Sequence, residues 1–254
     1  MKLTVMGCSG AFGAGQHTTS LLVDDDILID AGTGVGELDV DAMTRISQVF
    51  VTHCHLDHVC SIPFIVDAVG PARGAPLIVY GLVETLDALQ TCLFNNRIWP
   101  DFTALPHANA PWLQFRPIET GQSLRCGTRL LTALPAFHTS GAAGYCVDSG
   151  ASSLAFTGDT GPCDALREAL EAVGNLRYLL IETAFCEHER ARAIASRHLC
   201  PSLIAAELSK LRARPDIFIT HMKPHAAATI MSEIEQLIPD RHVTLLQRGQ
   251  AFEF

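Results

Sequence analysis

Two kinds of apolar pattern alternate along the 254-residue chain. Short runs rich in β-branched and aromatic residues predict strands, because such residues fit a pleated, buried surface. These runs cover residues 3–6, part of 20–29, 48–52, 77–80, 128–134, 154–157, 178–181, 217–220 and 243–246. Apolar residues spaced three and four positions apart predict helices over 165–173, 203–211 and 230–237. Gly174, Pro215 and Pro239 follow these helices and would end them.

Side chains that can bind a metal or carry a proton recur directly after the predicted strands. The strand exits concerned are Thr52-His53, Phe137-His138, Gly158-Asp159, Glu182-Thr183 and Thr220-His221. Because neighbouring strand ends lie along one edge of a sheet, side chains that follow several strands converge on one crevice. The pattern therefore predicts a site assembled from distant parts of the chain.

Composition describes a compact globular chain. Hydrophobic residues make up 48% and charged residues 18%, unlike a disordered chain. We find no repeat, low-complexity tract or linker, and predict a single domain over residues 1–254. No apolar stretch reaches the roughly 18 to 20 residues of a membrane helix, and the N-terminal apolar run is too short for a signal peptide. The nine cysteines form no C-x-x-C pair, which favours free thiols and a cytoplasmic location.

The charge balance argues against long nucleic acid as a partner. The formal net charge is −9, and only three residues are lysine, whereas proteins that bind long nucleic acid normally carry a basic patch. The arginines nearest to such a patch are Arg190, Arg192, Arg197, Arg212 and Arg214. Solvated helix faces account for them equally well. An anionic substrate would therefore depend on local positive charge.

One segment concentrates four side chains of metal-ligand type. His53, His55, Asp57 and His58 form an H-x-H-x-D-H motif. On a tight loop after a strand, His53 and His55 can point one way while Asp57 and His58 point another, which suits two adjacent metal ions. Imidazole and carboxylate are ligands for Zn, Mn or Fe. The alternative is a polar loop of hydrogen-bonded histidines, because such side chains need partners when buried.

This motif resembles that of the metallo-β-lactamase superfamily, and later segments follow the same pattern in order. His138 stands where the third histidine of the first metal is expected, and Asp159 where the bridging aspartate is expected. His221 stands at the position of the last histidine of the second metal. Asp30, in Leu28-Ile29-Asp30-Ala31-Gly32, resembles the superfamily's aspartate that orients ligands from behind.

The resemblance implies an α/β fold, a four-layer αββα sandwich with the metals at one edge. It implies two divalent metal ions, with Zn as the expected metal and Mn or Fe as alternatives. The implied ligands are His53, His55, Asp57, His58, His138, Asp159 and His221, and we also expect Asp57 to take part in catalysis. The glycines 7, 10, 13 and 15 lack dinucleotide-binding spacing and precede a β-like stretch. We interpret them as a flexible loop bordering the site.

Glu182 and His198 suggest a proton donor. Glu182 lies at a predicted strand end and His198 sixteen residues later, just before a helix. A carboxylate paired with this imidazole would fix its tautomer and favour its protonated form. Within the superfamily the pair looks like that of the phosphodiesterase branches, in which a leaving alkoxide needs a proton. The alternative is that the two side chains are an ordinary strand-end and helix-start pair.

Further segments are similar to the class II 3′,5′-cyclic-nucleotide phosphodiesterases. They are His221-Met222-Lys223-Pro224, residues 93–102 and His198-Leu199-Cys200-Pro201. Cys200 departs from the pattern, because a small hydroxylated residue is more usual there, and Cys54 lies inside the first motif. Lys223 could contact the phosphoryl group or be a surface lysine. Phe94, Trp99 and Phe102 could stack on a base or form ordinary core.

The resemblance thus implies hydrolysis of cyclic AMP or cyclic GMP to the 5′-monophosphate, with a metal-bridging hydroxide attacking phosphorus and His198 protonating the leaving 3′ oxygen. The alternatives are an RNase Z-like or cyclic-dinucleotide phosphodiesterase, a lactonase or thioesterase, and a non-catalytic nucleotide-binding protein. RNase Z carries a basic arm between the positions of His138 and Asp159, where this chain has no Lys or Arg. We also expect a small-molecule substrate, no contact with a membrane and a possible homodimer. His17 and His225 are candidates for supporting the site.

Overall fold

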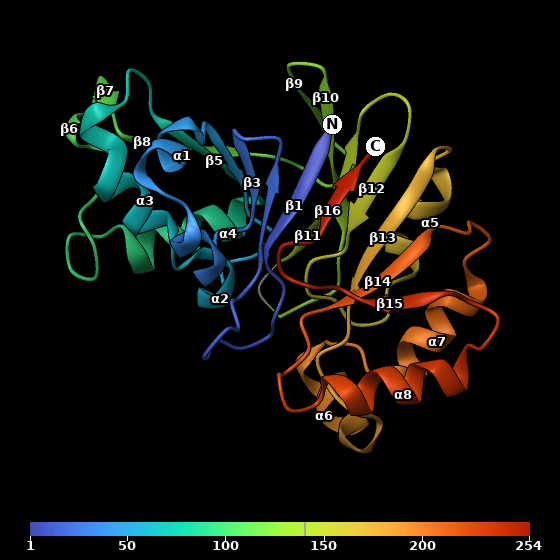
Figure 1. Ribbon diagram of the computed structural model, residues 1–254. Coiled ribbons are helices and arrows are strands. Elements are labelled where there is room, and N and C mark those ends of the chain that lie inside the picture. The colour runs from blue at the N-terminus through green and yellow to red at the C-terminus, as the bar shows by residue number, and fades with distance from the viewer. Residues whose placement is uncertain (140) are drawn as a thin grey trace.

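The computed structural model describes residues 1–139 and 141–254. Its strands form two seven-stranded sheets and one small two-stranded sheet. The strand order is β16-β1-β2-β3-β4-β5-β8 in the first sheet and β15-β14-β13-β12-β11-β10-β9 in the second. Figure 1 shows α1 to α4 beyond the first sheet, and α5, α7 and α8 beside the second.

The strands are short, and most of their side chains are buried. The first sheet contains β1 (Lys2–Gly7), β2 (Ser20–Val23), β3 (Ile27–Ile29), β4 (Gln48–Phe50), β5 (Leu77–Gly81), β8 (Leu113–Pro117) and β16 (Ala251–Glu253). The second contains β9 (Ser123–Cys126), β10 (Arg129–Pro135), β11 (Ala143–Asp148), β12 (Ser153–Phe156), β13 (Leu176–Glu182), β14 (Asp216–Thr220) and β15 (Val243–Leu245). The small sheet pairs β6 (Pro106–His107) with β7 (Ala110–Pro111).

Helices occupy most of the longer connections between strands. They are α1 (Val40–Arg45), α2 (Leu56–Val59), α3 (Ile62–Val69), α4 (Val83–Ala88), α5 (Asp164–Ala172), α6 (Arg190–Ser196), α7 (Pro201–Lys210) and α8 (Ala227–Leu237). Shorter helical turns are η1 (Thr33–Glu37), η2 (Gly70–Ala72), η3 (Leu89–Leu93) and η4 (Glu187–Glu189). Within the described residues, no helix combines the length and the apolarity that a membrane crossing requires.

Each sheet is antiparallel in one half and parallel in the other. In the first sheet β3, β4, β5 and β8 run parallel, and in the second β12, β13, β14 and β15 do so. Parallel neighbours need a crossover connection, which is usually helical. The crossovers therefore place helices on the outer face of each sheet, and they align the carboxyl ends of the parallel strands.

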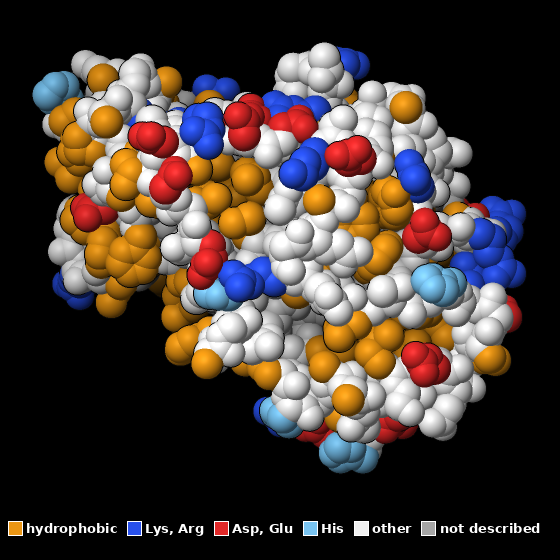
Figure 2. Space-filling model, viewed as in Figure 1, with side chains coloured by type: hydrophobic (Ala, Val, Ile, Leu, Met, Phe, Trp, Pro, Cys, Tyr) orange, Lys and Arg blue, Asp and Glu red, His pale blue; other side chains and the backbone are white. Residues whose placement is uncertain are grey.

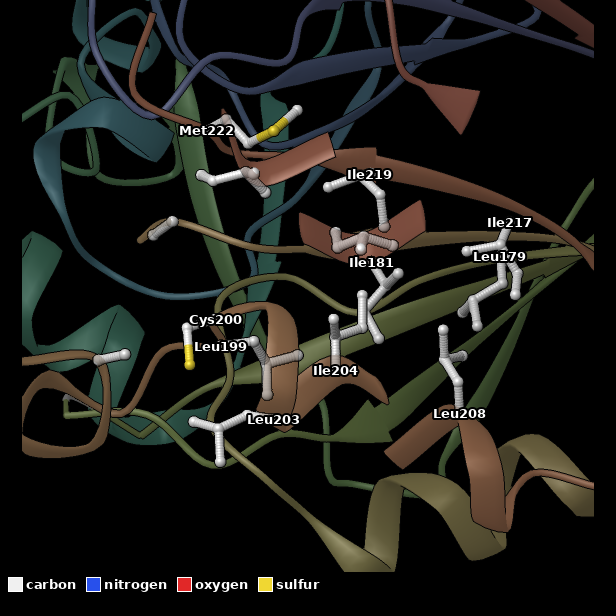
Figure 3. Close-up of a cluster of buried hydrophobic side chains, with 14 of the residues drawn as sticks. Leu179, Ile181, Leu199, Cys200, Leu203, Ile204, Leu208, Ile217, Ile219 and Met222 are labelled. Atoms are coloured by element: carbon white, nitrogen blue, oxygen red, sulfur yellow. The ribbon is translucent and has the colours of Figure 1, made fainter. Parts of the chain in front are cut away.

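Three groups of buried side chains hold the layers together. Between the sheets, Phe50 of β4 packs in one cluster with Tyr145 of β11, edge to face at 5.5 Å between ring centroids. Outside the first sheet, apolar residues of α3 pack against β4 and β5. Outside the second sheet, Figure 3 shows Ile204 and Leu208 of α7 pointing towards β13. Each fully buried side chain of this size contributes roughly 1.5 to 3 kcal/mol.

These layers run helix, sheet, sheet, helix, so the prediction of a four-layer αββα sandwich is confirmed. Burial of one apolar face on each outer helix and of both faces on each sheet explains the order of the layers. The assignment of residues 1–254 to a single domain stays a prediction.

Candidate metal and catalytic centre

The predicted site residues follow strands of both sheets. His53 comes after β4 of the first sheet, whereas Asp159 and His221 come after β12 and β14 of the second. Three strand exits pass through left-handed backbone, with φ of 57° at Asp30, 60° at Gly158 and 63° at His221. This conformation costs a residue with a Cβ roughly 1 to 2 kcal/mol. Such strain persists where the surroundings fix it, typically at functional sites.

A first cluster combines His53, His55, His138 and Asp159, with one ligand atom from each within 4.8 Å of the others. The Nδ1 atom of His55 lies 3.0 Å from Nε2 of His53 and 3.3 Å from Nε2 of His138. His53, His138 and Asp159 are buried, while His55 is partly exposed. The nitrogen atoms therefore face one another around a common point.

A second cluster combines Asp57, His58 and His221 within the same limit. The Oδ2 atom of Asp57 lies 3.7 Å from Nε2 of His58 and 3.8 Å from Nε2 of His221. Asp159 reaches both clusters. Its Oδ2 atom lies 3.7 Å from Nε2 of His53 and 3.2 Å from Nε2 of His221, and its Oδ1 atom lies 3.5 Å from Nε2 of His58.

The spacing and pairing of these atoms fit metal ions. Ligands bound at about 2.0 to 2.1 Å in a tetrahedron lie about 3.3 Å from one another, close to the 3.0 to 3.8 Å separations found here. Among residues 1–139 and 141–254, the buried Nε2 of His58 and Oδ1 of Asp159 have no hydrogen-bond partner. Unpaired buried polar atoms are costly. A divalent cation bound to both would satisfy them.

Asp30 and Thr52 fix the orientation of two histidines from beneath the site. Asp30 is fully buried, and its Oδ2 atom lies 2.7 Å from Nδ1 of His58. Thr52 donates its backbone N–H and its hydroxyl to Asp30, at 2.8 Å in both cases, and its Oγ1 lies 3.0 Å from Nδ1 of His53. Because Nδ1 of each ring is engaged, Nε2 is left facing the clusters.

Burial keeps most of the clustered histidines neutral. It lowers the pKa of His55 and His138, and burial together with His58 lowers the pKa of His53 well below its usual value. Burial also lowers the pKa of His221 to about 4. Neutral imidazole is the form that binds a metal. At neutral pH these four residues could therefore bind a cation without first losing a proton.

His58 differs from the other histidines. Burial opposes its charged form, but Asp159 and Asp30 raise its pKa well above the usual value. The acidic partner of His58 is Asp159. Burial raises the pKa of Asp159, but the nearby His221 and His58 lower it more, so that its pKa is well below the usual range. Without metal, His58 is therefore protonated at neutral pH, and a cation bound there must displace this proton.

Glu182 and His198 form a close pair beside the clusters. Nδ1 of His198 lies 2.7 Å from Oε1 of Glu182 and 4.0 Å from Oδ2 of Asp159. The ring of His198 stacks on that of His221 at 5.7 Å between centroids and 12° between planes. The pair predicted from the sequence is thus brought together next to the candidate ligands.

The hydrogen bonds of Glu182 identify its charge state. Burial raises the pKa of Glu182, and its carboxyl group accepts from His198 and from the backbone N–H groups of Thr160, Ala184 and Leu199. With these four donors, it acts as a carboxylate. Burial also opposes the charge on His198, but Glu182 raises the pKa of His198 above its usual value. The pair therefore favours the charged imidazole, in which Nε2 also carries a proton.

The glycine-rich loop between β1 and β2 lies against the turn that carries His221. Gly10 donates its N–H to the carbonyl oxygen of Met222 at 3.0 Å, and Nζ of Lys223 donates to the carbonyl oxygen of Gly10 at 2.5 Å. His221 in turn donates its N–H to the carbonyl oxygen of Cys8 at 2.8 Å. The loop therefore borders the site, and Lys223 is partly buried and held at its edge.

The two aromatic residues predicted to contact substrate, Phe94 and Trp99, lie in different surroundings. Phe94 is fully buried and packs against Phe102 and Phe115 at 6.2 and 5.9 Å between centroids. Its assignment to substrate binding is wrong, because its ring belongs to the core outside the first sheet. Trp99 packs edge to face against the exposed Phe64 at 5.2 Å, and a contact with substrate stays a prediction for it.

The two supporting histidines also differ. His17 lies at the base of the glycine-rich loop, where its carbonyl oxygen accepts from the N–H groups of Cys8 and Ser9. Its Nε2 atom lies 3.4 Å from a carboxylate oxygen of Glu37. His225 is exposed in the turn before α8. The backbone of His17 therefore supports the loop beside the site, and within the described residues neither His17 nor His225 belongs to a ligand cluster.

Sequence reasoning missed Thr52 and Arg197. Thr52, the residue before His53, bonds both Asp30 and His53. Arg197, for which the sequence leaves a basic patch and a solvated helix face open, donates its guanidinium to the carbonyl oxygen of His138 at 2.7 Å. Neither contact has a sequence signal, because a hydroxyl beside a histidine and an arginine after a helix are common in any globular protein.

Comparison with known proteins places the chain in a family. A family model described as the beta-lactamase superfamily domain matches residues 25–241. A probable 3′,5′-cyclic-nucleotide phosphodiesterase of Yersinia pestis is 27% identical over 221 residues, which cover 75% of this chain and 63% of that protein. A 3′,5′-cyclic-nucleotide phosphodiesterase of Schizosaccharomyces pombe is 25% identical over 251 residues, which cover 83% and 70%.

The fold is likewise shared with a solved structure. The crystal structure of unliganded yeast PDE1 superposes with a TM-score of 0.85 at 16% identity, covering 100% of this chain and 99% of that one. The chain spans somewhat less than two thirds of the length of the Yersinia pestis relative. Because the family model matches most of its residues, the chain belongs to the beta-lactamase superfamily.

Proposed function

We propose that this chain is a metal-dependent phosphodiesterase that hydrolyses 3′,5′-cyclic nucleotides to 5′-monophosphates. The observation that carries the proposal is the contact between Glu182 and His198, 2.7 Å long and next to the candidate ligands. Through this contact, His198 would be a proton donor for the alkoxide that leaves when a phosphodiester bound at the metals is hydrolysed. The names of the Yersinia pestis and Schizosaccharomyces pombe relatives support the substrate class.

Two divalent ions would be bound, with Zn expected and Mn or Fe compatible with the same ligands. His53, His55, His138 and Asp159 would hold the first, and Asp57, His58, His221 and Asp159 the second. When bound, such ions supply Lewis acidity towards a phosphoryl oxygen and lower the pKa of a water molecule.

The chain's own residues handle the departing oxygen. As the oxygen of a water molecule bonds to phosphorus and the bond from phosphorus to the 3′ oxygen breaks, Nε2 of His198 gives its proton to that oxygen. Glu182 stabilises the charged imidazole before the transfer, because its carboxylate accepts from Nδ1. The attacking water loses one proton to the solvent, and the neutral His198 regains one proton from the solvent before the next turnover. The product is the 5′-monophosphate.

Lys223 would assist with charge at the phosphoryl group. It is one of three lysines, and its position at the edge of the site is fixed by its hydrogen bond to Gly10. A fixed ammonium near developing negative charge stabilises a phosphoryl transition state. On the face shown in Figure 2, Lys and Arg side chains are interspersed with Asp and Glu. This distribution supports a small substrate that is bound by local charge, and a homodimer and a cytoplasmic location remain predictions.

The test is turnover of 3′,5′-cyclic AMP and 3′,5′-cyclic GMP by purified protein loaded with Zn or Mn. A chelator-treated sample is the control, and chromatography against authentic 3′- and 5′-monophosphates identifies the product. We expect metal-dependent release of the 5′-monophosphate only. A protein that holds its metals but turns over neither substrate would overturn the proposal, and release of the 3′-monophosphate would overturn the assignment of the bond that is broken.

A further inference from the structure

Arg197 ends helix α6 in an unfavourable backbone conformation. Its φ and ψ angles are 56° and 52°, which is the left-handed region. Its N–H bonds the carbonyl oxygen of Ile194 at 3.2 Å, and the N–H of His198 bonds that of Ala193 at 2.8 Å. Helices commonly end on such a residue, but it is usually glycine, because a Cβ is disfavoured there. An arginine at this position is therefore expected to make side-chain contacts that offset the cost of its backbone conformation.

The contacts of Arg197 converge on one neighbour, His138. The carbonyl oxygen of Arg197 lies 3.0 Å from Nδ1 of His138. Its guanidinium donates from Nη1 to the carbonyl oxygen of His138 at 2.7 Å, and the guanidinium carbon lies 4.6 Å from the ring centroid of Phe137. One residue thus holds both the side chain and the main chain of His138, although the two are far apart in sequence.

These contacts determine how His138 faces the first cluster. A carbonyl oxygen can only accept, so Nδ1 of His138 must carry the proton and Nε2 keeps its lone pair. That Nε2 atom lies 3.3 Å from Nδ1 of His55, inside the cluster. Fixing the tautomer and the ring of a ligand in this way commonly changes metal affinity by 10- to 100-fold.

The same backbone turn also orients His198. Because Arg197 is left-handed, its carbonyl group points to His138 while the next residue returns to Glu182, whose carboxylate lies 2.7 Å from Nδ1 of His198. The His138 and His198 rings lie edge to face, 4.7 Å apart. Arg197 therefore stands between a candidate ligand and the candidate proton donor.

We infer that Arg197 is a positioning residue whose guanidinium locks His138 in the orientation for metal binding while its left-handed backbone places His198. The contact between guanidinium and carbonyl is the part that glycine could not supply. Among the ion pairs of residues 1–139 and 141–254, none joins Arg197 to a carboxylate, so this cation is not engaged in a salt bridge. The inference rests on the metal-binding role proposed for His138, but not on the identity of the substrate.

The test compares three variants of the full chain. Arg197→Gly keeps the carbonyl contact and suits the left-handed backbone, but removes the guanidinium. Arg197→Asn also removes the guanidinium, and asparagine tolerates the left-handed conformation. It is included because glycine could make the turn more flexible. Arg192→Ala is the matched control, because Arg192 also projects from α6 over an aromatic ring, that of Phe185, at 5.0 Å.

Each protein is stripped of metal, and its thermal midpoint and its zinc and cobalt dissociation constants are measured. For Arg197→Gly and Arg197→Asn we expect an unchanged or higher thermal midpoint without metal. At least one zinc dissociation constant should be about 10-fold higher, because zinc binds more weakly. The visible spectrum of the cobalt form should change, and added guanidinium ion should partly restore affinity in Arg197→Gly. Arg192→Ala should match the unaltered protein throughout.

Zinc dissociation constants within twofold of the unaltered protein in both variants would overturn the inference. A lower midpoint without metal combined with unchanged affinity would do the same, because it would mark an ordinary structural contact. Failure of the unaltered protein to hydrolyse cyclic nucleotides would overturn the proposed function but would leave these metal measurements, and the inference drawn from them, unaffected.

Discussion

Gly10 lies so close to His221 that a Cβ atom on residue 10 would be 2.3 Å from the carbonyl oxygen of His221. The backbone N–H of Gly10 bonds the next carbonyl oxygen, that of Met222, at 3.0 Å. The β1–β2 loop can therefore pack against the turn after β14 only because residue 10 has no side chain. Gly10, which belongs to the loop expected to border the site, thus allows close packing beside a candidate ligand.

Replacing Gly10 with alanine should destabilise the protein. The added methyl group meets backbone, which cannot rotate away, and overpacking of this kind typically costs about 1 to 3 kcal/mol. Urea unfolding of Gly10→Ala should show a lower midpoint. Gly13→Ala in the same loop is the control, because a Cβ there would have nothing within 4 Å. Equal midpoints for the two variants would contradict the close packing described here.

Removing the proton donor should slow the reaction without removing the metals. His198→Gln keeps a polar side chain but cannot donate a proton as imidazolium does, so kcat for cyclic AMP should fall about 10²- to 10⁴-fold. Hydrolysis of a p-nitrophenyl phosphodiester should fall much less, since that leaving group departs without a proton. His188→Gln, at an exposed histidine in the same region, should be unaffected. Equal losses on both substrates would argue against proton donation by His198.

The Glu182–His198 pair should determine the alkaline limit of activity. Glu182 raises the pKa of His198, so the charged donor is present below this raised pKa and is lost as pH rises through it. Glu182→Gln removes the carboxylate charge and should move the alkaline limb of the profile of kcat/KM against pH to lower pH. Glu168→Gln, at an exposed position, is the control. An unshifted limb would show that a different group sets it.

Asp30 should control metal binding at the second cluster. Asp30→Asn leaves His58 without its carboxylate partner 2.7 Å away, and a loss of this kind commonly weakens metal binding 10- to 100-fold. Competition with a chromophoric chelator would measure it, with Asp25→Asn at an exposed position as control. His58 must lose a proton to bind metal, so affinity in the unaltered protein should rise with pH until its raised pKa is passed. In Asp30→Asn this rise should end at lower pH.

The strands that the sequence predicts well are those whose apolar residues run without interruption. Residues 217–220 were expected as a strand, and β14 spans Asp216–Thr220. The strand β11 (Ala143–Asp148) was missed, because it includes Gly144 and Cys146 and lacks a strong β-forming run. The helix α3 (Ile62–Val69) was missed for the opposite reason, since its apolar residues are almost continuous and hide the helical period.

In the candidate site, the sequence predicts roles that depend on the type of a side chain, but not roles that depend on where a side chain points. The clustered histidines and aspartates could be selected because such residues are rare in close succession and costly to bury. Phe94 could not be assigned from its type, because an aromatic ring serves a core as well as a binding site. Arg197 could not be found at all, since its partner is a backbone carbonyl group, which every residue possesses.

The two clusters draw on both sheets, from His53 after β4 to His221 after β14. Contacts between residues so far apart in the chain close long loops, and the entropy of loop closure must be offset before such contacts stabilise the fold. Neither half of the polypeptide holds all members of either cluster, so a partly folded chain would offer a divalent cation fewer of the candidate ligands than the folded protein does. A cation bound by either cluster would therefore link the two halves of the chain and favour the folded state over the unfolded one.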